Sequence, residues 1–348
     1  MSEETANASV RAAGEKDGMQ APSCETSNVA TSISSAPDRP SLEQRAAEAR
    51  EAGWDCTLSL TLSYQGASFS GFARQKEERL KTVQGEVEQA LSLLFRREVK
   101  TVCAGRTDAG VHARAQVVSF DVTEDELAGR ELRRLKRSLN ALTDEGISIA
   151  SVDERPLGFS ARFDALWREY HYHISTEEAP PVLIEPLVWH AGGGVLDVDA
   201  MRAGAACLVG EHDFKSFCLV ASAVGKSTFR NVMELEIYPE ELAGFPVTTV
   251  RIVGSAFLHS MVRTIVGTLM AVGRGRQDAA WVQQVLDARD RSAAGENAPA
   301  SGLVFWRVGY PPACAPVSRL GEGQLGALAP SDATASDATT PLDAACGR

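Results

Sequence analysis

The segment CAGRTDAGVHA, residues 103–113, gathers the side chains best suited to chemistry. It places Arg106 and Asp108 two residues apart in one loop bounded by glycines. Glycine permits a tight backbone path and close approach of a ligand. An aspartate there can act as nucleophile or base, and the arginine can keep it ionised or bind phosphate. The same spacing also fits an Asx-turn with a surface Arg–Asp pair, so the residues alone leave both interpretations open.

The elements that must position this loop alternate between strand and helix periodicity. A capping box of Thr123 and Glu126 predicts the start of one long helix that carries a leucine stripe to Leu139. The other predicted strands are 56–63, 99–103, 115–122, 147–152, 167–174, 231–239, 246–254 and 303–309, and the other predicted helices are 82–94, 197–209, 258–272 and 278–287. This order predicts an α+β fold of two halves, 54–155 and 156–312, each a mixed or antiparallel sheet backed by helices.

Both ends of the chain differ from this middle in composition. Residues 1–53 and 313–348 are rich in Ala, Ser, Thr and acidic residues and lack apolar periodicity. Segments of this kind bury too little apolar surface to offset the entropy of ordering. Both are therefore predicted to be disordered tails.

Charge, hydropathy and cysteine usage narrow the class of protein. The 348 residues hold 35 Lys plus Arg against 46 Asp plus Glu, a net charge of −11. Such a balance disfavours nucleic-acid binding through bulk electrostatics. The longest apolar stretch, 253–273, is interrupted by His259 and Arg263, which argues against a membrane span. Seven scattered cysteines without a CxxC pair indicate neither a disulfide framework nor a zinc site, and no signal peptide is apparent, so a cytoplasmic protein is expected.

Several segments together resemble the TruA family of tRNA pseudouridine synthases, in the order of that family and over roughly residues 54–312. These segments are SYQGASFSGFARQ (63–75), TVQGEVEQAL (82–91), AGRTDAGVHA (104–113), FSARFDALWREYHY (159–172), GEHDFKSF (210–217), FRNVMELEI (229–237), FLHSMVRTIVGTLMAVG (257–273) and GLVFWRVGYP (302–311). The resemblance implies an isomerase that breaks the N1–C1′ bond of a uridine, turns the base and forms a C5–C1′ bond. This reaction implies no cofactor and no metal.

The resemblance also assigns catalytic roles. It makes Asp108 the catalytic nucleophile, Tyr170 the residue that stacks on the target base, and Arg263 the partner of the aspartate. A carboxylate can capture or stabilise an oxocarbenium-like C1′, as in retaining glycosidases, and a guanidinium beside it opposes its protonation. From the residues alone, a core tyrosine on a strand is the favoured interpretation of Tyr170. Arg263 could be a helix-surface arginine, but its apolar neighbours Met261, Val262, Ile265 and Val266 disfavour an ordinary solvated face.

Further residues follow as substrate contacts. The resemblance implies that Tyr170, Arg106, His112 and Arg162 bind the RNA, although His112 fits a loop-ordering hydrogen bond equally well. It further implies a tRNA anticodon stem-loop as substrate, with uridines 38, 39 and 40 as targets, and a homodimer as the active species. A non-catalytic RNA-binding protein that keeps the same fold is the alternative. A glycoside hydrolase built on Asp108 is disfavoured because no partner acid is apparent.

Three other patterns carry weaker signals. His171 and His173 alternate along a strand like a metal pair but lack a third ligand. The segment GKST, residues 225–228, resembles the end of a P-loop, but the required first glycine is replaced by Val220. On the predicted long helix, Arg130, Arg134 and Arg137 share one face, either a solvated face or a phosphate-binding stripe.

The negative net charge is compatible with an RNA-binding site because part of that charge lies in the two tails. The first 50 residues hold 8 acids and 5 bases, and the last 36 hold 4 and 2, so 34 acids and 28 bases remain between them, a net of −6. A phosphate backbone responds to the field within a Debye length, about 8 Å in physiological salt. The sequence therefore predicts a basic catalytic cleft between the two halves of an acidic protein.

Overall fold

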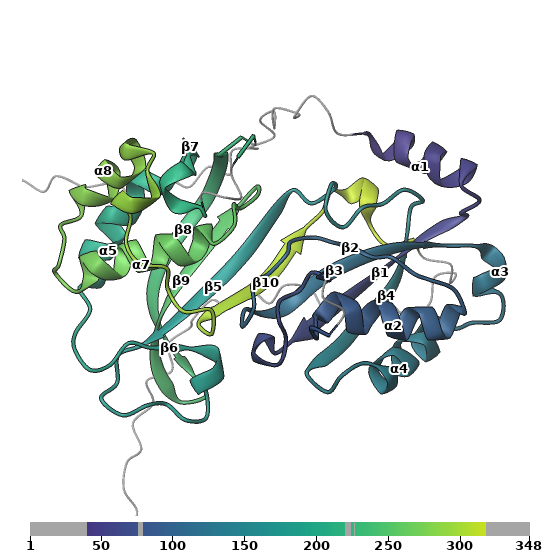
Figure 1. The fold of residues 1–348 in the computed structure, drawn as a ribbon, viewed down its shortest axis with the longest axis horizontal. Coiled ribbons are helices and arrows are strands. Elements are labelled where there is room, and N and C mark those ends of the chain that lie inside the picture. Colours follow the sequence, from purple (N-terminus) through teal and green to yellow (C-terminus); the bar gives the residue numbers. More distant parts are fainter. Residues whose placement is uncertain (1–39, 76–78, 220–223, 226, 318–348) are drawn as a thin grey trace, which may run out of the picture. The chain divides into compact units, whose positions relative to one another are not determined.

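A ten-stranded mixed sheet organises residues 40–75, 79–219, 224–225 and 227–317, which are the residues that the computed structural model describes (Figure 1). Along the sheet the strands are β4 (Ile147–Arg155), β1 (Cys56–Tyr64), β3 (His112–Val122), β10 (Leu303–Gly309), β5 (Trp167–Ser175), β9 (Phe245–Gly254), β8 (Phe229–Leu242) and β7 (Gly210–Asp213). Off this path, β2 (Val102–Cys103) pairs with β3, and β6 (Trp189–His190) pairs with β5. The β3–β10 and β5–β6 pairs are parallel, and the other pairs are antiparallel.

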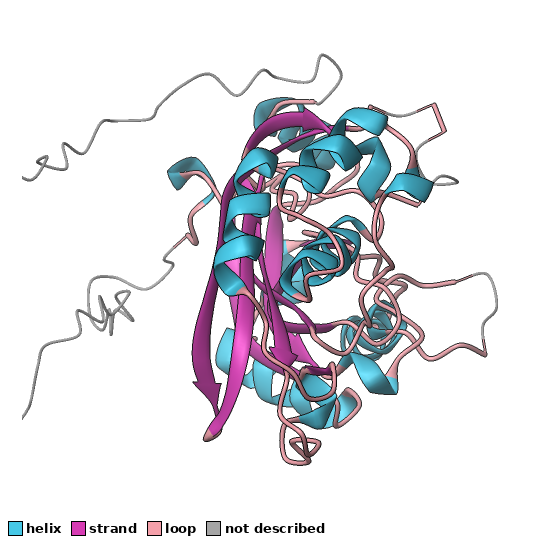
Figure 2. Ribbon diagram, turned by 90° about the vertical axis from the view of Figure 1, so that its left-hand side faces the viewer, coloured by secondary structure: helices cyan, strands magenta, loops and turns pink. Residues whose placement is uncertain are grey.

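The longer helices pack mainly on one face of this sheet, as the view along the sheet in Figure 2 shows. The helices of the described residues are α1 (Leu42–Glu51), α2 (Val83–Phe95), α3 (Glu124–Leu127), α4 (Leu132–Leu142), α5 (Val198–Ala205), α7 (Met261–Gly273) and α8 (Ala280–Ala288). Helix α7 is the most deeply buried of these elements, because apolar residues cover nearly its whole circumference. This arrangement confirms the predicted α+β fold, and no helix of the described ranges is both long and apolar enough to cross a membrane.

Strand β10 joins the two predicted halves within this sheet. It lies between β3 and β5, and its Val304 and Phe305 pair with His112 and Ala113 of β3. The described chain from Pro40 onward forms one compact unit. The predicted division near residue 156 therefore crosses a continuous sheet, and its status as a domain boundary stays a prediction.

The long helix predicted from Thr123 is divided into α3 and α4, so the prediction of a single helix is wrong. The capping box itself is present: Thr123 Oγ1 accepts from the Glu126 amide at 3.2 Å, and the Glu126 carboxylate accepts from the Thr123 amide at 3.0 Å. The break follows at Gly129, whose φ of 70° lies in the left-handed region that ends helices. The leucine stripe spans the break because Leu127 and Leu135 are both buried.

The tail predicted to be disordered up to residue 53 contains helix α1, so that part of the prediction is wrong. Ser41 and Gln44 form a capping box at its start, and Ala46 and Ala49 are buried. The helix lacks a strong apolar stripe, and its order comes from this cap and from tertiary contacts. At the other end, residues 313–317 are also placed, with Cys314 buried. The remaining tail residues, 1–39 and 318–348, lie outside the described residues.

Candidate active site

The loop that carries Asp108 connects β2 to β3 and is held from two sides. The Gln116 amide donates to the Gly105 carbonyl at 2.6 Å, which ties the start of the loop to strand β3. On the other side, the Phe72 amide donates to the Thr107 carbonyl at 3.0 Å. Because these bonds fix the backbone on both sides of residue 106, the Asp108 carboxylate is presented from a rigid loop rather than from a mobile one.

The Asp108 carboxylate receives polar groups on both of its oxygens. Arg263 Nη1 lies 3.2 Å from Oδ2, and the Ser260 hydroxyl donates to the same oxygen at 3.1 Å. His259 Nε2 lies 3.1 Å from Oδ1. The aspartate side chain nevertheless keeps 29% of its surface exposed, so a ligand can still reach it. The predicted pairing of Asp108 with Arg263 is present.

Helix α7 explains why Arg263 is directed at this carboxylate. Its neighbours Met261 and Val262 are buried, and the Arg263 side chain is only 17% exposed. Its Nε donates to the Ala298 carbonyl at 2.7 Å, which leaves the Nη1 side of the guanidinium for Asp108. The alternative of a solvated helix-surface arginine is therefore wrong, and a charge-assisted contact fixes the relation between the loop and the helix.

His259 and Ser260 are site residues that the sequence analysis did not assign. They stand directly before α7, four and three residues ahead of Arg263 respectively, in the motif FLHSMVR. Ser260 has a φ of 60°, a left-handed conformation that is costly for a residue other than glycine. Polar residues at the start of an apolar helix that carries an assigned arginine were the available signal.

Tyr170 is the core tyrosine on a strand that the sequence allowed, and its stacking on a target base stays a prediction. Its side chain is buried on β5, with its ring edge-on between Phe257 at 5.1 Å and Phe305 at 5.2 Å. A Cβ placed on Gly105 would lie 3.5 Å from the Tyr170 hydroxyl, so this oxygen faces the loop that carries Asp108. Burial raises the pKa of the hydroxyl, which therefore stays protonated near neutral pH.

Arg106 and Arg162 are both exposed and come from different parts of the chain to the same place. Burial raises the pKa of the Cys103 thiol to about 11, and the charges of Arg106, Arg162 and Arg168 act against this rise. The two exposed guanidinium groups therefore lie near the start of the loop that carries Asp108, where the sequence predicts RNA contacts. Their binding to RNA stays a prediction.

His112 is oriented for a structural contact. Its side chain is buried, and its Nδ1 accepts from the Gly66 amide at 3.2 Å. Burial lowers its pKa, which favours the neutral ring that can accept this bond. The approach is close, because a Cβ on Gly66 would overlap the Val111 carbonyl. The loop-ordering interpretation is therefore present in the structure, and an RNA contact by His112 stays a prediction.

The two histidines that resemble a metal pair in the sequence make other contacts in the structure. His171 bonds to Glu169 at 2.8 Å and His173 lies 3.3 Å from the Leu187 carbonyl. In the described part of the chain, no group of three or more His, Cys, Asp or Glu side chains could hold a metal ion. Lys226 of the P-loop-like segment lies outside the described residues.

The predicted arginine stripe is interrupted, because Arg130 lies in the connection between α3 and α4 and not on the helix that carries Arg134 and Arg137. Its residues are partly engaged within the protein. The Arg130 guanidinium lies 5.1 Å from the Phe95 ring centre, and Arg134 pairs with Glu131 at 3.2 Å. Both contacts are at the surface, where such pairs contribute little stability. The phosphate-binding interpretation of this stripe stays a prediction.

Comparison with known proteins places this geometry in a family. Residues 61–164 and 205–311 match the family model described as tRNA pseudouridine synthase. Two curated relatives named tRNA pseudouridine synthase A, from Streptomyces avermitilis and Brevibacillus brevis, are each 40% identical over 259 and 253 residues, covering 73% of this chain and 88% and 99% of the relatives. A third, from Bacillus subtilis, is 39% identical and is covered over 98% of its length. The chain belongs to the tRNA pseudouridine synthase family, whose members are isomerases that convert uridine to pseudouridine in tRNA.

Proposed function

We propose that this enzyme isomerises uridines 38, 39 and 40 in the anticodon stem-loop of tRNAs, with Asp108 as the nucleophile. The observation that carries this proposal is the partly exposed carboxylate of Asp108, held by Arg263, Ser260 and His259 at 3.1 to 3.2 Å on a rigid loop. A fixed, partly open carboxylate with an adjacent positive charge is what covalent or electrostatic catalysis at C1′ requires.

The reaction then divides among the site residues. The Asp108 carboxylate attacks or stabilises the electron-poor centre as the N1–C1′ bond breaks, and the base turns before C5 bonds to C1′. The Arg263 guanidinium stabilises the carboxylate through the Nη1 contact. The Tyr170 hydroxyl lies close to Gly105 and, because burial keeps it protonated, can donate a hydrogen bond to the turning base, whereas the C5 proton leaves to solvent. The proton lost from C5 is matched by a proton taken up from solvent at the ring nitrogen that is released from C1′, so the product is an isomer of the substrate.

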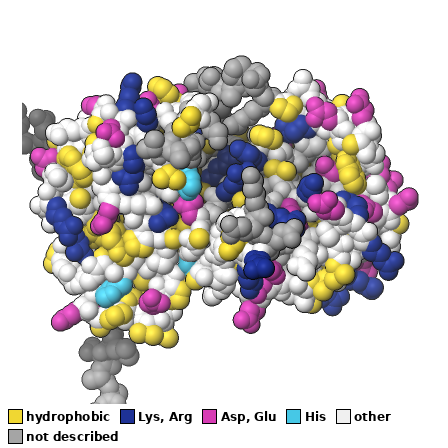
Figure 3. All heavy atoms as spheres, in the orientation of Figure 1, with side chains coloured by type: hydrophobic (Ala, Val, Ile, Leu, Met, Phe, Trp, Pro, Cys, Tyr) yellow, Lys and Arg dark blue, Asp and Glu magenta, His cyan; other side chains and the backbone are white. Residues whose placement is uncertain are grey.

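Recognition of the RNA requires access to a base that is normally stacked. Enzymes of this kind extrude the target nucleotide, and side chains bind its neighbours. Exposed Arg106 and Arg162 provide positive charge beside the loop that carries Asp108, residues 104–111, which we call the catalytic loop. Figure 3 shows Lys and Arg side chains gathered near the middle of the face it draws, although the whole chain is acidic. A local basic patch of this kind supports phosphate binding despite the net charge.

The decisive experiment uses tRNA labelled with tritium at uridine C5, because formation of the C5–C1′ bond expels that hydrogen. We expect release by the intact enzyme and a loss of at least about a thousandfold for Asp108→Ala, as for removal of other catalytic nucleophiles. Asp125→Ala, at an exposed position on α3, is the matched control and should release tritium normally. Binding of tRNA without release would instead favour the non-catalytic RNA-binding protein.

The positions modified need a separate readout. Transcripts in which uridine 38, 39 or 40 is replaced singly by cytidine should each lose a corresponding share of tritium release. Release that is unchanged in a transcript lacking all three uridines would contradict the proposed substrate site. The proposal also includes a homodimer in the cytoplasm, and light scattering of the purified enzyme, which should give twice the chain mass of 37.2 kDa, tests the oligomeric state.

A further inference from the structure

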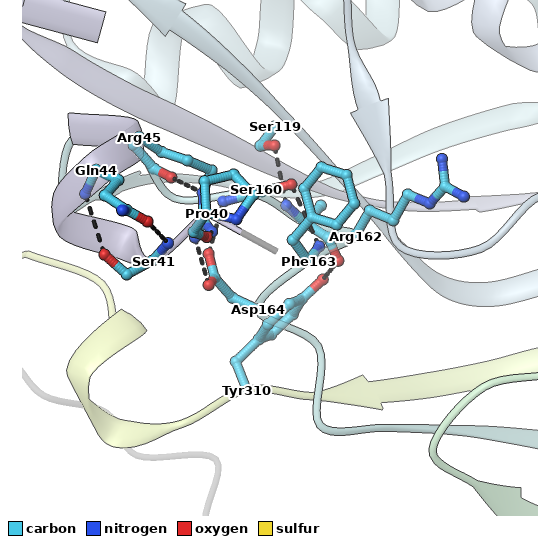
Figure 4. A network of polar contacts seen from close by, with 12 residues as sticks. Pro40, Ser41, Gln44, Arg45, Ser119, Ser160, Arg162, Phe163, Asp164 and Tyr310 are labelled. Atoms are coloured by element: carbon cyan, nitrogen blue, oxygen red, sulfur yellow. Dashed lines mark hydrogen bonds and ion pairs between the residues drawn. The ribbon is translucent and has the colours of Figure 1, made fainter. Parts of the chain in front are cut away.

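Helix α1 is attached to the loop that carries Arg162, although α1 lies outside the residues matched by the family model (Figure 4). The Arg45 guanidinium pairs with the Asp164 carboxylate at 2.5 Å, and its Nε donates to the Gly158 carbonyl at 2.8 Å. Both charged side chains are only 12% exposed. A charge-assisted pair that is shielded from solvent in this way is stronger than an ordinary surface salt bridge.

The fit between helix and loop is also steric. Gly158 has a φ of 83°, and a Cβ at this position would lie 2.5 Å from the Ala46 amide nitrogen and 2.8 Å from its Cα. Atoms cannot approach so closely, so only glycine allows the backbone of α1 to rest on the loop here. The Gly158 amide in turn donates to Thr57 Oγ1 at 3.1 Å, which continues the contact to strand β1.

Asp164 organises the loop beyond its pair with Arg45. Its second carboxylate oxygen accepts from the Ser160 amide at 2.8 Å, and its own amide donates to the Ser160 carbonyl at 3.1 Å. The neighbouring Ala161 is fixed by Tyr310, whose hydroxyl donates to its carbonyl at 2.8 Å. Arg45 therefore contacts the residue that closes this turn.

The turn presents two exposed side chains, Arg162 and Phe163. The Arg162 guanidinium lies 5.6 Å from the Phe163 ring centre, and in Figure 4 it points away from Asp164. The Arg162 carbonyl accepts a hydrogen bond from Arg168 Nη2 at 2.7 Å. The same Nη2 of Arg168 also donates to the Ala104 carbonyl at 3.0 Å, at the start of the catalytic loop. The backbone of the turn thus has one anchor toward the catalytic loop and a second toward α1.

We propose that α1 is a clamp for the substrate-binding turn and that Arg45 is a positioning residue, which sets the orientation of Arg162 and Phe163 toward the RNA. This inference rests on the proposed function, since it assigns the turn to tRNA binding. The anchor through Arg168 remains when Arg45 is lost, so the catalytic loop keeps its place. Loss of the clamp therefore weakens tRNA binding and leaves the chemical step unchanged.

Arg45→Gln tests the clamp in the full-length enzyme, with Arg50→Gln on the exposed side of the same helix as the matched control. We expect Arg45→Gln to raise KM and the Kd for tRNA roughly tenfold, as expected for one lost charge-assisted contact, with kcat within about twofold of the wild type. Arg45→Lys, which keeps the charge but not the fork of donors, should recover part of the affinity. A fall in kcat with unchanged Kd, or a wild-type Kd, would overturn the proposal.

A double-mutant cycle separates positioning from general destabilisation. If Arg45 acts through the turn, Arg45→Gln should add little to the Kd of an Arg162→Gln enzyme, because the orientation it sets no longer matters. Additive effects of the two substitutions, or a wild-type Kd for Arg162→Gln, would contradict the proposed route. Tritium release by the wild-type enzyme in the same assays keeps this result distinct from a failure of the proposed function.

A second variant disturbs the contact between α1 and the turn by a change in the turn, and it alters no charged residue. Gly158→Ala should push α1 off the turn and raise the Kd for tRNA as Arg45→Gln does. Gly129→Ala is its control, since Gly129 also has a positive φ, 70°, but has no atom within 4 Å of an added Cβ. Equal Kd values for the two alanine variants would overturn the steric part of the clamp.

Discussion

Two carboxylates of this enzyme have similar partners but different surroundings. Asp108 contacts Arg263 and His259, whereas Glu169 on β5 contacts His171 at 2.8 Å and two arginines. Those arginines are Arg251, at 3.0 Å, and Arg307, at 2.7 Å. The Asp108 side chain is 29% exposed and the Glu169 side chain 3%. The two carboxylates therefore have the same types of partner, but only Asp108 is accessible to a ligand.

The difference separates a carboxylate that a substrate can reach from one that the protein covers. Each Glu169 oxygen is covered by protein donors, and the His171 ring behind it is stacked on Trp306 at 4.1 Å with an angle of 4° between the planes. Burial alone would raise the pKa of Glu169, but hydrogen bonds from His171, Arg307 and Arg251 lower it to about 2. This group is a fixed structural anion, whereas Asp108 keeps open surface for a substrate.

Arginine removal at the two sites should separate these roles most clearly. Arg263→Leu should lower kcat about a hundredfold and change the Kd for tRNA little, because the guanidinium contacts Asp108, the proposed nucleophile. Arg251→Leu removes the equivalent charge beside Glu169 and should lower stability while leaving kcat near the wild type. Tritium release and a tRNA-binding titration measure both. A defect of Arg263→Leu confined to the Kd would contradict the pairing role.

Glu169→Gln should convert the low pKa into a measurable loss of stability. The folded-state pKa of about 2 lies below the ordinary 4.5, so ionised Glu169 stabilises the native state by about 3 kcal/mol at neutral pH. This contribution is complete above pH 4.5 and is lost as the pH falls toward 2. Urea unfolding of both proteins should therefore give a difference that shrinks between pH 5 and pH 3. A difference that stays constant with pH would show that the carboxylate charge is not its source.

The sequence predicted the elements that depend on local patterns and missed an element that depends on contacts between distant residues. The last strand was predicted at 303–309 and is found there, because alternation of side chains is a local signal. Helix α1 was missed, since its weak apolar stripe is compensated by the contact of Arg45 with Asp164, which lies 119 residues away. Local periodicity cannot report such a contact, although the capping box at Ser41 was visible in principle.

Some residues of the candidate site could likewise be identified from the sequence, and others could not. Resemblance to the family selected Asp108 and Arg263, and the structure brings them together across 155 residues. It did not select His259 or Ser260, because their role arises from a left-handed turn at the start of α7 that no spacing in the sequence specifies. His112 was assigned to the RNA from the same motif, yet its burial against Gly66 follows from how the loop folds back on itself.

The smallest expected effect, at Ser260, would sharpen the comparison further, because no residue of β5, the strand that carries Glu169, has a left-handed backbone conformation. Ser260→Ala removes the hydroxyl that donates to Asp108 and keeps the backbone strain of φ 60°, whereas Ser260→Gly removes both. Each should lower kcat by roughly fivefold, the scale of one lost hydrogen bond to a charged group that keeps other partners. Only the glycine variant should gain stability, by about 1 kcal/mol, since the left-handed conformation costs glycine little. Thermal unfolding and tritium release on the same samples test both expectations. Equal kcat for alanine, glycine and serine would mean that the strain at Ser260 serves the turn alone and that Arg263 and His259 suffice to hold Asp108.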